Sequence, residues 1–365
     1  MMEKVRLGDI FEYMAKSKIK AGEGKKEGKY KFFTSSNLQD KFIDEWVYDG
    51  EYLIFGTGGK ASINYCNEKF STSTDNFVVK VKKGINTKLI YLYFKNDMQK
   101  LEKGFKGASI KHISKDYINQ LTIPLYELKF QEKIVKQLDK VQEIIDLRKK
   151  QIEELEELIR AQFVDMFGDI YDNKNNFIIK ELDYYTSMIT YGLTIRPKFV
   201  EKGIDLISAR EINSGNIDYD KAPKISEDDY NKLSDKAKPK KNEILFSKTG
   251  TIGLCAIIDS EIKFAITQNA ARIVPKENIN PIWLLYYLRT DEIQSYCKRQ
   301  AKGNAVKDFQ IQDMKKIPIL DCSISKQNEF VEKVKQIDKQ KIILKKSLKE
   351  TEELQESLMN KYFGE

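Results

Sequence analysis

The second half of this 365-residue chain repeats the first half, and the repeat constrains the fold more than any other feature of the sequence. The segment GASIKHISKDYINQLTIPLYELKFQEKIVKQL, which begins at Gly107, aligns without a gap with GNAVKDFQIQDMKKIPILDCSISKQNEFVEKV, which begins at Gly303, 196 positions later. The same register continues for about sixty residues, until Phe167-Gly168 falls on Phe363-Gly364. A repeat of this length indicates a tandem of two similar units.

Upstream of Gly107 the halves match more loosely, with insertions between short blocks. The block NTKLIYLYFKND, from Asn86, aligns with NPIWLLYYLRTD, from Asn280. EYLIFGTG aligns with EILFSKTG, which puts Thr57-Gly58 on Thr249-Gly250. β-Rich runs such as NFVVKVK and ARIVP alternate with helical runs such as PIWLLYYL, so each half is expected to hold a mixed sheet with flanking helices.

The end of each half reads as a long helix. Apolar residues recur in steps of four and three from Ile134 to Ile159 and, with more interruptions, from Phe330 to Leu358. This pattern, without internal Gly or Pro, predicts a coiled-coil seam between two helices. About 38 residues at 1.5 Å each make a rod of roughly 57 Å. The alternative is an ordinary amphipathic helix that lies on its own domain.

The predicted fold class is therefore α+β, with two tandem globular domains that are each followed by a long helix. The expected parts are a first domain over 1–125, a central long helix over 126–169, a second domain over 170–322 and a C-terminal long helix over 323–365. Two similar halves pack most simply about a twofold axis. The helices would then form an antiparallel coiled coil with one domain at each end, a pseudo-twofold dumbbell.

The net charge of +8 lies outside the two tails, because the tails together hold slightly more Asp and Glu than Lys and Arg. A positive excess on both domains suits a partner that carries phosphates, although a lysine-rich proteome would give the same composition. The sequence has no run of about 18 apolar residues and does not begin like a secretory signal. We therefore expect no membrane span and a cytoplasmic location.

Catalytic, cofactor and metal sites find little support in the sequence. GTGGKA, from Gly56, fits a dinucleotide fingerprint only formally, because the segment that follows is not helical. The single histidine, His112, falls on Asp308 in the repeat, and the four cysteines are scattered, so neither a repeated catalytic histidine nor a zinc site is expected. All prolines are isolated, so the Asn/Asp-Pro-Pro-aromatic tetrapeptide of an amino-methylating enzyme is missing. We expect a binding protein without chemistry of its own.

The tandem halves, the block INQLTIPLYELKFQEKIVKQL and the helices that end in FVDMFGD and LMNKYFGE resemble the specificity (S) subunit of type I restriction-modification systems. In that family a proline, followed by a glutamine at the start of a long helix, closes each recognition domain. The matching segments are Pro124–Gln131 and Pro318–Gln327. The second departs from the pattern, because its proline sits earlier and Cys322-Ser323 replaces a proline-rich turn. The resemblance covers the whole chain.

The resemblance implies that each domain is a target recognition domain for one half of an asymmetric, split site in double-stranded DNA, with the helix pair setting the spacer. It also implies two methyltransferase (M) subunits, which methylate adenine from S-adenosylmethionine. Restriction (R) subunits would add an ATP- and magnesium-dependent motor and nuclease. This chain would be non-catalytic and would bind none of these cofactors.

Polar side chains on corresponding loops of the two domains would then contact DNA, since Arg, Lys, Asn, Gln and Ser hydrogen-bond bases and phosphates. For any single residue, a turn or a solvated loop is the alternative. The residues expected to hold phosphates are Lys60, Lys106, Lys111, Lys198, Lys248, Lys302 and Lys307. The residues expected to face base edges are Asn37, Ser73, Asn76, Arg196, Arg210, Gln268, Asn269 and Arg272.

Two other interpretations stay open. The chain could be the recognition module of a single-chain restriction enzyme or an orphan S-like module that works with a different partner, which co-purification would reveal. It could also be a coiled-coil scaffold without a role on DNA, which predicts no duplex binding at low salt.

Overall fold

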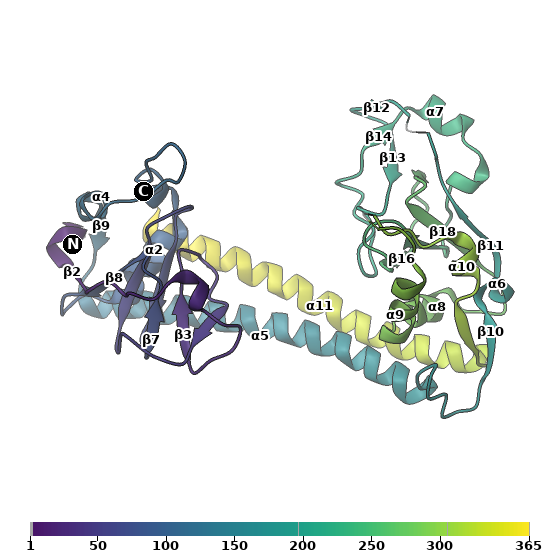
Figure 1. Cartoon of the computed structure of the whole chain (residues 1–365), viewed down its shortest axis with the longest axis horizontal. Helices are drawn as coiled ribbons and strands as arrows, with labels where there is room; N and C mark the ends of the chain where they lie inside the picture. Colours follow the sequence, from purple (N-terminus) through teal and green to yellow (C-terminus); the bar gives the residue numbers. More distant parts are fainter. Residues whose placement is uncertain (1–2, 196, 305, 365) are drawn as a thin grey trace. The chain divides into compact units, whose positions relative to one another are not determined.

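The computed structural model describes residues 3–195, 197–304 and 306–364 and divides into two compact units. The first unit comprises residues 1–150 together with 345–365, and the second comprises residues 151–344. Each unit contains one mixed α+β domain and parts of both long helices (Figure 1). Within the described ranges, no helix has the length and apolar character needed to cross a membrane.

The first domain is built on two small sheets. A four-stranded antiparallel sheet has the order β2-β8-β5-β6, and a three-stranded sheet has the order β4-β3-β7, in which β3 and β7 are parallel. The strands are β1 (Glu3–Arg6), β2 (Phe11–Tyr13), β3 (Tyr30–Phe33), β4 (Lys41–Ile43), β5 (Tyr52–Gly56), β6 (Ile63–Cys66), β7 (Phe70–Thr72), β8 (Asn76–Val81) and β9 (Thr122–Leu125). The helices are α1 (Leu7–Ile10), the 3-10 helix η1 (Ala21–Glu23), α2 (Thr87–Asn96), α3 (Gln99–Glu102) and α4 (Lys115–Gln120).

The second domain repeats this plan, as the sequence repeat predicts. Its four-stranded sheet has the order β11-β18-β15-β16, and the other sheet has the order β12-β14-β13-β17, in which β13 and β17 are parallel. The strands are β10 (Ile178–Glu181), β11 (Thr186–Tyr191), β12 (Phe199–Val200), β13 (Ile204–Ile207), β14 (Lys224–Ile225), β15 (Ile244–Ser247), β16 (Cys255–Ile257), β17 (Phe264–Ile266), β18 (Ala270–Pro275) and β19 (Pro318–Asp321). The helices are α6 (Leu182–Tyr185), α7 (Glu227–Lys232), the 3-10 helix η2 (Asp235–Ala237), α8 (Pro281–Leu288), α9 (Asp291–Gln300) and α10 (Ile311–Lys315).

In both domains the first strand pairs with the strand that precedes the long helix. β1 pairs antiparallel with β9 in the first domain, and β10 pairs antiparallel with β19 in the second. The beginning and the end of each domain are therefore hydrogen-bonded to each other.

The strand register corrects the sequence alignment by one residue. The alignment placed Phe55 on Ser247. In the structure Phe55 corresponds to Phe246, because each belongs to the apolar cluster of its own domain that includes the helix beside the sheet. The residue before each phenylalanine belongs to the cluster on the opposite face of the sheet. The pairing of β5 with β8 ends at Gly56, and that of β15 with β18 ends at Ser247. A one-residue slip would exchange the two faces of the strand. Gly58-Gly59, rather than Thr57-Gly58, is thus equivalent to Thr249-Gly250.

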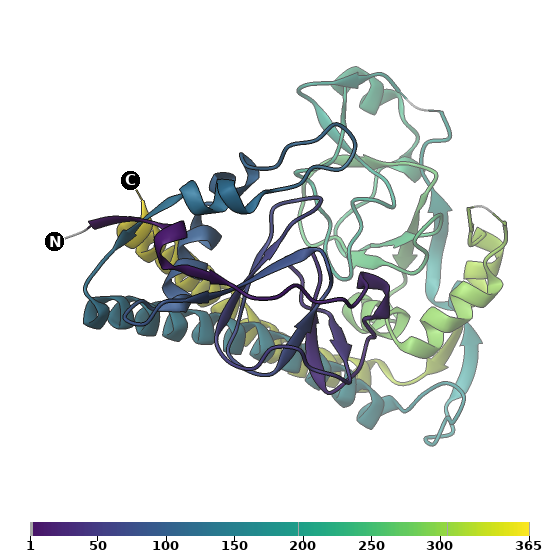
Figure 2. The same ribbon diagram turned by 60° about the vertical axis from the view of Figure 1, so that its left-hand side comes forward.

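The two long helices are α5 (Leu128–Phe167) and α11 (Ile324–Phe363), each of 40 residues. In the first unit the start of α5 contacts the end of α11: the rings of Phe130 and Tyr362 pack edge to face at 6.3 Å. In the second unit the end of α5 contacts the start of α11: the rings of Phe163 and Phe330 pack edge to face at 5.2 Å. The helices are therefore antiparallel where they pair, as predicted, and Figure 2 shows the pairing from a second direction.

A buried glutamine fixes each long helix to its domain. Gln131 Oε1 accepts a hydrogen bond from the backbone amide of Asn86 at 2.8 Å, and its Nε2 donates to the carbonyl of Tyr126 at 2.7 Å. Gln327 makes the equivalent bonds to Asn280 and Cys322, at 2.8 and 3.0 Å. Both glutamines are only 1 % exposed. Because Asn86 and Asn280 are the N-caps of α2 and α8, each amide joins the long helix to the helix beside the sheet.

Candidate nucleic-acid interface

In the first domain, the turn after β5 and a hairpin near the end of the domain are hydrogen-bonded to each other. The hairpin is closed by Lys106 and His112, whose backbone amides and carbonyls pair in both directions at 2.9 Å. Gly59 N donates to the carbonyl of Lys111 at 3.0 Å. The side chains of Lys60, Lys106 and Lys111 are exposed. The structure thus brings three of the lysines predicted for phosphate contact onto two adjoining loops.

The three other candidates of the first domain differ in burial. Asn37 is exposed and ties its loop to the same turn: its Nδ2 donates to the carbonyl of Ala61 at 3.1 Å, and its Oδ1 accepts from Ile63 N at 3.3 Å. Ser73 and Asn76 are buried, and Asn76 Nδ2 donates to Ser73 Oγ at 2.9 Å. The prediction that these two side chains face base edges is therefore wrong. They brace the loop between β7 and β8 from the inside.

The second domain has the same backbone frame. Its hairpin is closed by Lys302 and Asp308, whose amides and carbonyls pair at 2.9 and 2.8 Å, and Gly250 N donates to the carbonyl of Lys307 at 3.0 Å. Gly59 and Gly250 have positive φ angles of 84° and 82°. Only glycine adopts this conformation without strain, which explains a glycine at the same point of both turns. Lys302 and Lys307 are exposed, like their counterparts in the first domain.

Lys248 does not present a free charge. Its ammonium lies 2.5 Å from Asp308 Oδ1, and the same oxygen accepts a hydrogen bond from Thr249 Oγ1 at 2.6 Å. Burial alone would raise the pKa of Asp308, but the hydrogen bonds from Lys248 and Thr249 hold that pKa below its usual value. The prediction that Lys248 holds a phosphate is wrong, because the ion pair with Asp308 neutralises the charge of Lys248. Lys302 also has an ion pair, with Asp313 at 3.3 Å, but its side chain stays exposed.

Two hollows of the second domain share the predicted amides Gln268 and Asn269. One hollow, of about 690 Å³, lies between these amides and the hairpin residues Val306 and Asp308. The other, of about 310 Å³, lies between the same amides and Arg210. Lys198 is exposed on the neighbouring segment, and Arg196 lies outside the described residues. The structure therefore gathers Arg210, Gln268 and Asn269 on one continuous concave surface.

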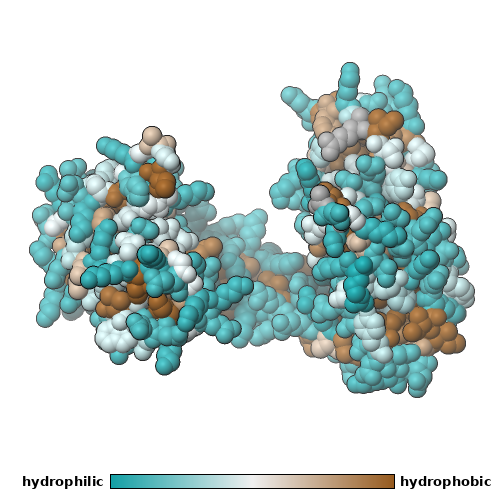
Figure 3. All heavy atoms as spheres, viewed as in Figure 1, coloured by the Kyte–Doolittle hydropathy of each residue, from teal (hydrophilic) through white to brown (hydrophobic). Residues whose placement is uncertain are grey.

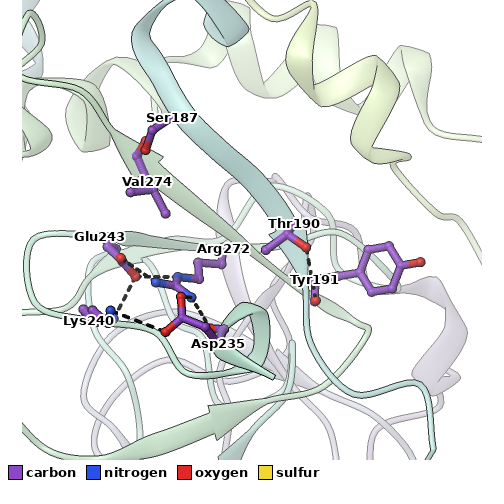
Figure 4. A network of polar contacts seen from close by, with 8 residues as sticks. All are labelled: Ser187, Thr190, Tyr191, Asp235, Lys240, Glu243, Arg272 and Val274. Atoms are coloured by element: carbon purple, nitrogen blue, oxygen red, sulfur yellow. Dashed lines mark hydrogen bonds and ion pairs between the residues drawn. The ribbon is translucent and has the colours of Figure 1, made fainter. Parts of the chain in front are cut away.

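Arg272, by contrast, belongs to the interior of the second domain. It lies in β18 with 2 % of its surface exposed, and Figure 4 shows its guanidinium between Glu243 and Asp235. Nε and Nη2 donate to the two oxygens of Glu243 at 2.6 and 2.7 Å, and Nη1 donates to the carbonyl of Asp235 at 2.5 Å. The prediction that Arg272 faces a base edge is wrong. Its guanidinium pairs with the carboxylate of Glu243 and holds the η2 segment against the sheet.

The face of both domains that Figure 3 shows is mostly hydrophilic. Figure 3 shows polar side chains over most of the visible face of each domain, with apolar residues in small separate patches. Loops with exposed lysines and amides, supported by buried polar bonds, suit contact with a polar and anionic partner.

A comparison with protein-family models decides the class of protein. The model for the type I restriction modification DNA specificity domain matches residues 1–157 and 198–355. The chain belongs to this family. Its members recognise DNA for type I restriction-modification systems, and the enzymatic activities of these systems reside in other subunits.

Relatives and solved structures agree with this assignment. The chain is 24 % identical to the EcoBI specificity subunit of Escherichia coli over 80 % of its own length and 67 % of the relative. It is 22 % identical to the MjaVIII specificity subunit of Methanocaldococcus jannaschii over 98 % of this chain and 91 % of that relative. The structure of the type I S subunit from M. genitalium matches with a TM-score of 0.66 at 16 % identity, over 100 % of this chain and 96 % of that one. This match shows the S-subunit fold.

Sequence reasoning missed the apolar residues of the candidate interface. Ile110 and Val306 are exposed near the tips of the two hairpins, and the half-exposed Tyr191 lines the larger hollow of the second domain. A signal was available in the repeat, because Ile110 falls on Val306 at the shift of 196. Hydrogen-bonding capacity alone does not reveal these residues, because aliphatic side chains have neither donors nor acceptors.

The cysteines do not add chemistry to the interface. All four are free thiols and buried. Burial raises the pKa of Cys255 and of Cys297 to about 12, so neither thiol forms a nucleophilic thiolate near neutral pH. Among the residues that the structure describes, no group of three or more His, Cys, Asp or Glu side chains could hold a metal ion.

Proposed function

We propose that this chain is the subunit that reads DNA sequence in a type I restriction-modification complex, with one domain for each half of an asymmetric, bipartite site. The family assignment supports DNA recognition. In the proposal, two M subunits methylate adenine from S-adenosylmethionine, and R subunits supply the ATP- and magnesium-dependent motor and nuclease. The helix pair α5 and α11 sets the spacer, with half-sites about one helical turn, or roughly 10 bp, apart.

The observation that carries the proposal is a common loop frame with unlike side chains. The turn after β5 or β15 is bonded to a hairpin in the same way in both domains, through Gly59 or Gly250. The side chains on that frame differ, since Lys60 corresponds to Thr251 and His112 corresponds to Asp308. Two domains that dock alike but read different bases require this combination, because backbone contacts position a protein and side chains specify the sequence.

The exposed lysines supply the part of binding that does not depend on sequence. Lys60, Lys106 and Lys111 in the first domain, and Lys302 and Lys307 in the second, lie on loops of the common frame. Each lysine that neutralises a phosphate releases a counterion, so binding should weaken steeply with salt. Arg210, Gln268 and Asn269 have the donors and acceptors that read base edges in the major groove.

The decisive experiment exchanges one domain. The chain is produced with the M subunits encoded beside its gene, and methylated adenines are mapped across host DNA. Replacement of residues 1–125 by the equivalent domain of another S subunit should change one half of the methylated motif and leave the other half and the spacer unchanged. A matched exchange of 170–322 should change only the other half.

Domain exchange, co-purification and duplex binding at low salt together separate the alternatives. If both halves of the motif change after a single exchange, the assignment of one domain to each half-site is wrong. If the chain binds the duplex but co-purifies with a protein other than a methyltransferase, it is an orphan recognition module. A chain that binds no duplex at low salt, alone or with M subunits, is a scaffold.

A further inference from the structure

The hairpin 106–112 and its counterpart, described for residues 302–304 and 306–308, each present one β-branched aliphatic side chain to solvent. Ile110 is 64 % exposed and Val306 is 61 % exposed. The two residues are equivalent in the repeat, whereas other hairpin positions differ, since Ser109 falls on Ala305 and His112 on Asp308. A single exposed aliphatic residue is common on protein surfaces. The same residue class at the same tip of two domains with different loops indicates a shared task.

Each hairpin requires a glycine near the aliphatic residue. Gly107 has a φ of 144°, and a Cβ at this position would lie 2.5 Å from the carbonyl oxygen of Ile110. Gly303 has a φ of 111°, and its Cβ would lie 2.3 Å from the carbonyl oxygen of Val306. Any other residue would push the tip away. The close approach of the backbone therefore fixes where each aliphatic side chain begins.

The base of each hairpin is fixed as well. The two-way backbone pairs of Lys106 with His112 and of Lys302 with Asp308 close the hairpins, and Lys111 and Lys307 bond to the turns after β5 and β15. An aliphatic side chain on such an element is held in position before its partner arrives, which lowers the entropic cost of inserting it.

Lysines flank both aliphatic residues. In each domain one exposed lysine stands four positions before the aliphatic residue and another stands directly after it, namely Lys106 and Lys111 around Ile110, and Lys302 and Lys307 around Val306. An apolar pocket on another protein would not require a cation on either side. A DNA groove suits this arrangement, because its floor of stacked base pairs lies between two rows of phosphates.

We propose that Ile110 and Val306 are wedges that enter the groove of each half-site and partly unstack one base step, while the flanking lysines hold phosphates on either side. Inserted aliphatic side chains of this kind bend DNA and bring more of the duplex against the protein. The inference rests on the proposed function. Since the wedge is common to both domains, it positions and bends the DNA, and the differing side chains around it read the sequence.

The test uses the chain assembled with its M subunits and a duplex that carries the methylated motif. A 2-aminopurine placed at successive steps of each half-site reports unstacking, and energy transfer between dyes at the duplex ends reports bending. Ile110→Ala should lower the 2-aminopurine signal in one half-site, reduce the bend and weaken binding by about tenfold, and Val306→Ala should act in the other half-site. The methylated motif itself should not change. Ile110→Val should behave like the wild type.

Ile262→Ala is the matched control. Ile262 is also an exposed aliphatic residue, at 52 % exposure, but it lies on the loop before β17, at the end of that strand opposite to Gln268. This variant should leave all three signals unchanged. If the wild-type complex binds its bipartite site and both alanine variants bind, bend and unstack it equally, the wedge is wrong and the proposed function stands. If the variants lose M subunits while the free chain binds DNA normally, the hairpins are protein contacts and the proposal is also wrong. If the wild type binds no bipartite duplex, the proposed function itself has failed.

Discussion

At the scale of single residues, burial decides which of the polar side chains can meet DNA. Arg272 and Lys60 belong to the residue types that bind nucleic acids, but Arg272 is paired with Glu243 inside the domain, whereas Lys60 is exposed. The sequence does contain a hint of this difference. Arg272 stands within the apolar run ARIVP, where a charged side chain needs a buried partner, whereas Lys60 follows two glycines.

The pair of Arg272 and Glu243 gives a prediction about stability. Arg272→Ala should destabilise the second domain by about 3–5 kcal/mol, because it leaves the carboxylate of Glu243 buried without its cation. The double variant Arg272→Met with Glu243→Leu should recover much of this loss, since neither charge then remains. Urea unfolding followed by circular dichroism measures both effects. If the Arg272→Ala chain unfolds like the wild type but directs its M subunits to an altered motif, Arg272 reads a base.

At the scale of elements, the parts with a strong period could be predicted and the parts held by local contacts could not. The apolar steps from Ile134 to Ile159 predict a long helix, and α5 covers them. The repeat predicts two domains of like topology, which the strand orders confirm. The alignment of β5 with β15 failed by one residue because both strands are apolar on both faces, so the sequence shows no alternation that would fix the register. Contacts such as that of Lys248 with Asp308 join residues far apart in the chain and leave no pattern.

The pairing of β10 with β19 should depend on pH. The hydrogen bond from Lys180, at 2.7 Å, and that from Tyr185, at 2.6 Å, hold the pKa of Asp321 in β19 below its usual value. A carboxylate with a lowered folded-state pKa stabilises the fold above its unfolded pKa, near 3.9. This contribution is lost as the pH falls through the folded-state value.

The expected result is a free-energy difference between wild type and Asp321→Asn that is largest near neutral pH and shrinks below about pH 4. Urea unfolding across pH 3 to 7 measures it. Asp220→Asn, at an exposed carboxylate before β14, is the control and should show little difference from wild type at any pH. A difference for Asp321→Asn that is independent of pH would mean that the carboxylate charge does not stabilise the strand pair.

At the scale of the whole molecule, two helices of 40 residues link the recognition domains along the chain. Their antiparallel contacts include an ion pair of Lys149 with Glu352 at 3.1 Å in the first unit and one of Lys341 with Glu156 at 3.1 Å in the second. If these helices set the spacer of the bipartite site, the spacer must depend on their length. One heptad changes the length of a helix by about 10 Å, close to three base pairs of DNA, while it preserves the apolar face.

Removal of the heptad 150–156 from α5, together with the facing heptad 342–348 from α11, should therefore shorten the preferred spacer by about three base pairs. The measurement is selection from a duplex library in which both half-sites are constant and the spacer varies, with the M subunits present. Removal of a heptad from one helix alone is the control, and it should destabilise the chain because the remaining partners no longer face each other. A preferred spacer that stays the same after the paired deletion would mean that the helices join the domains without measuring the distance between half-sites.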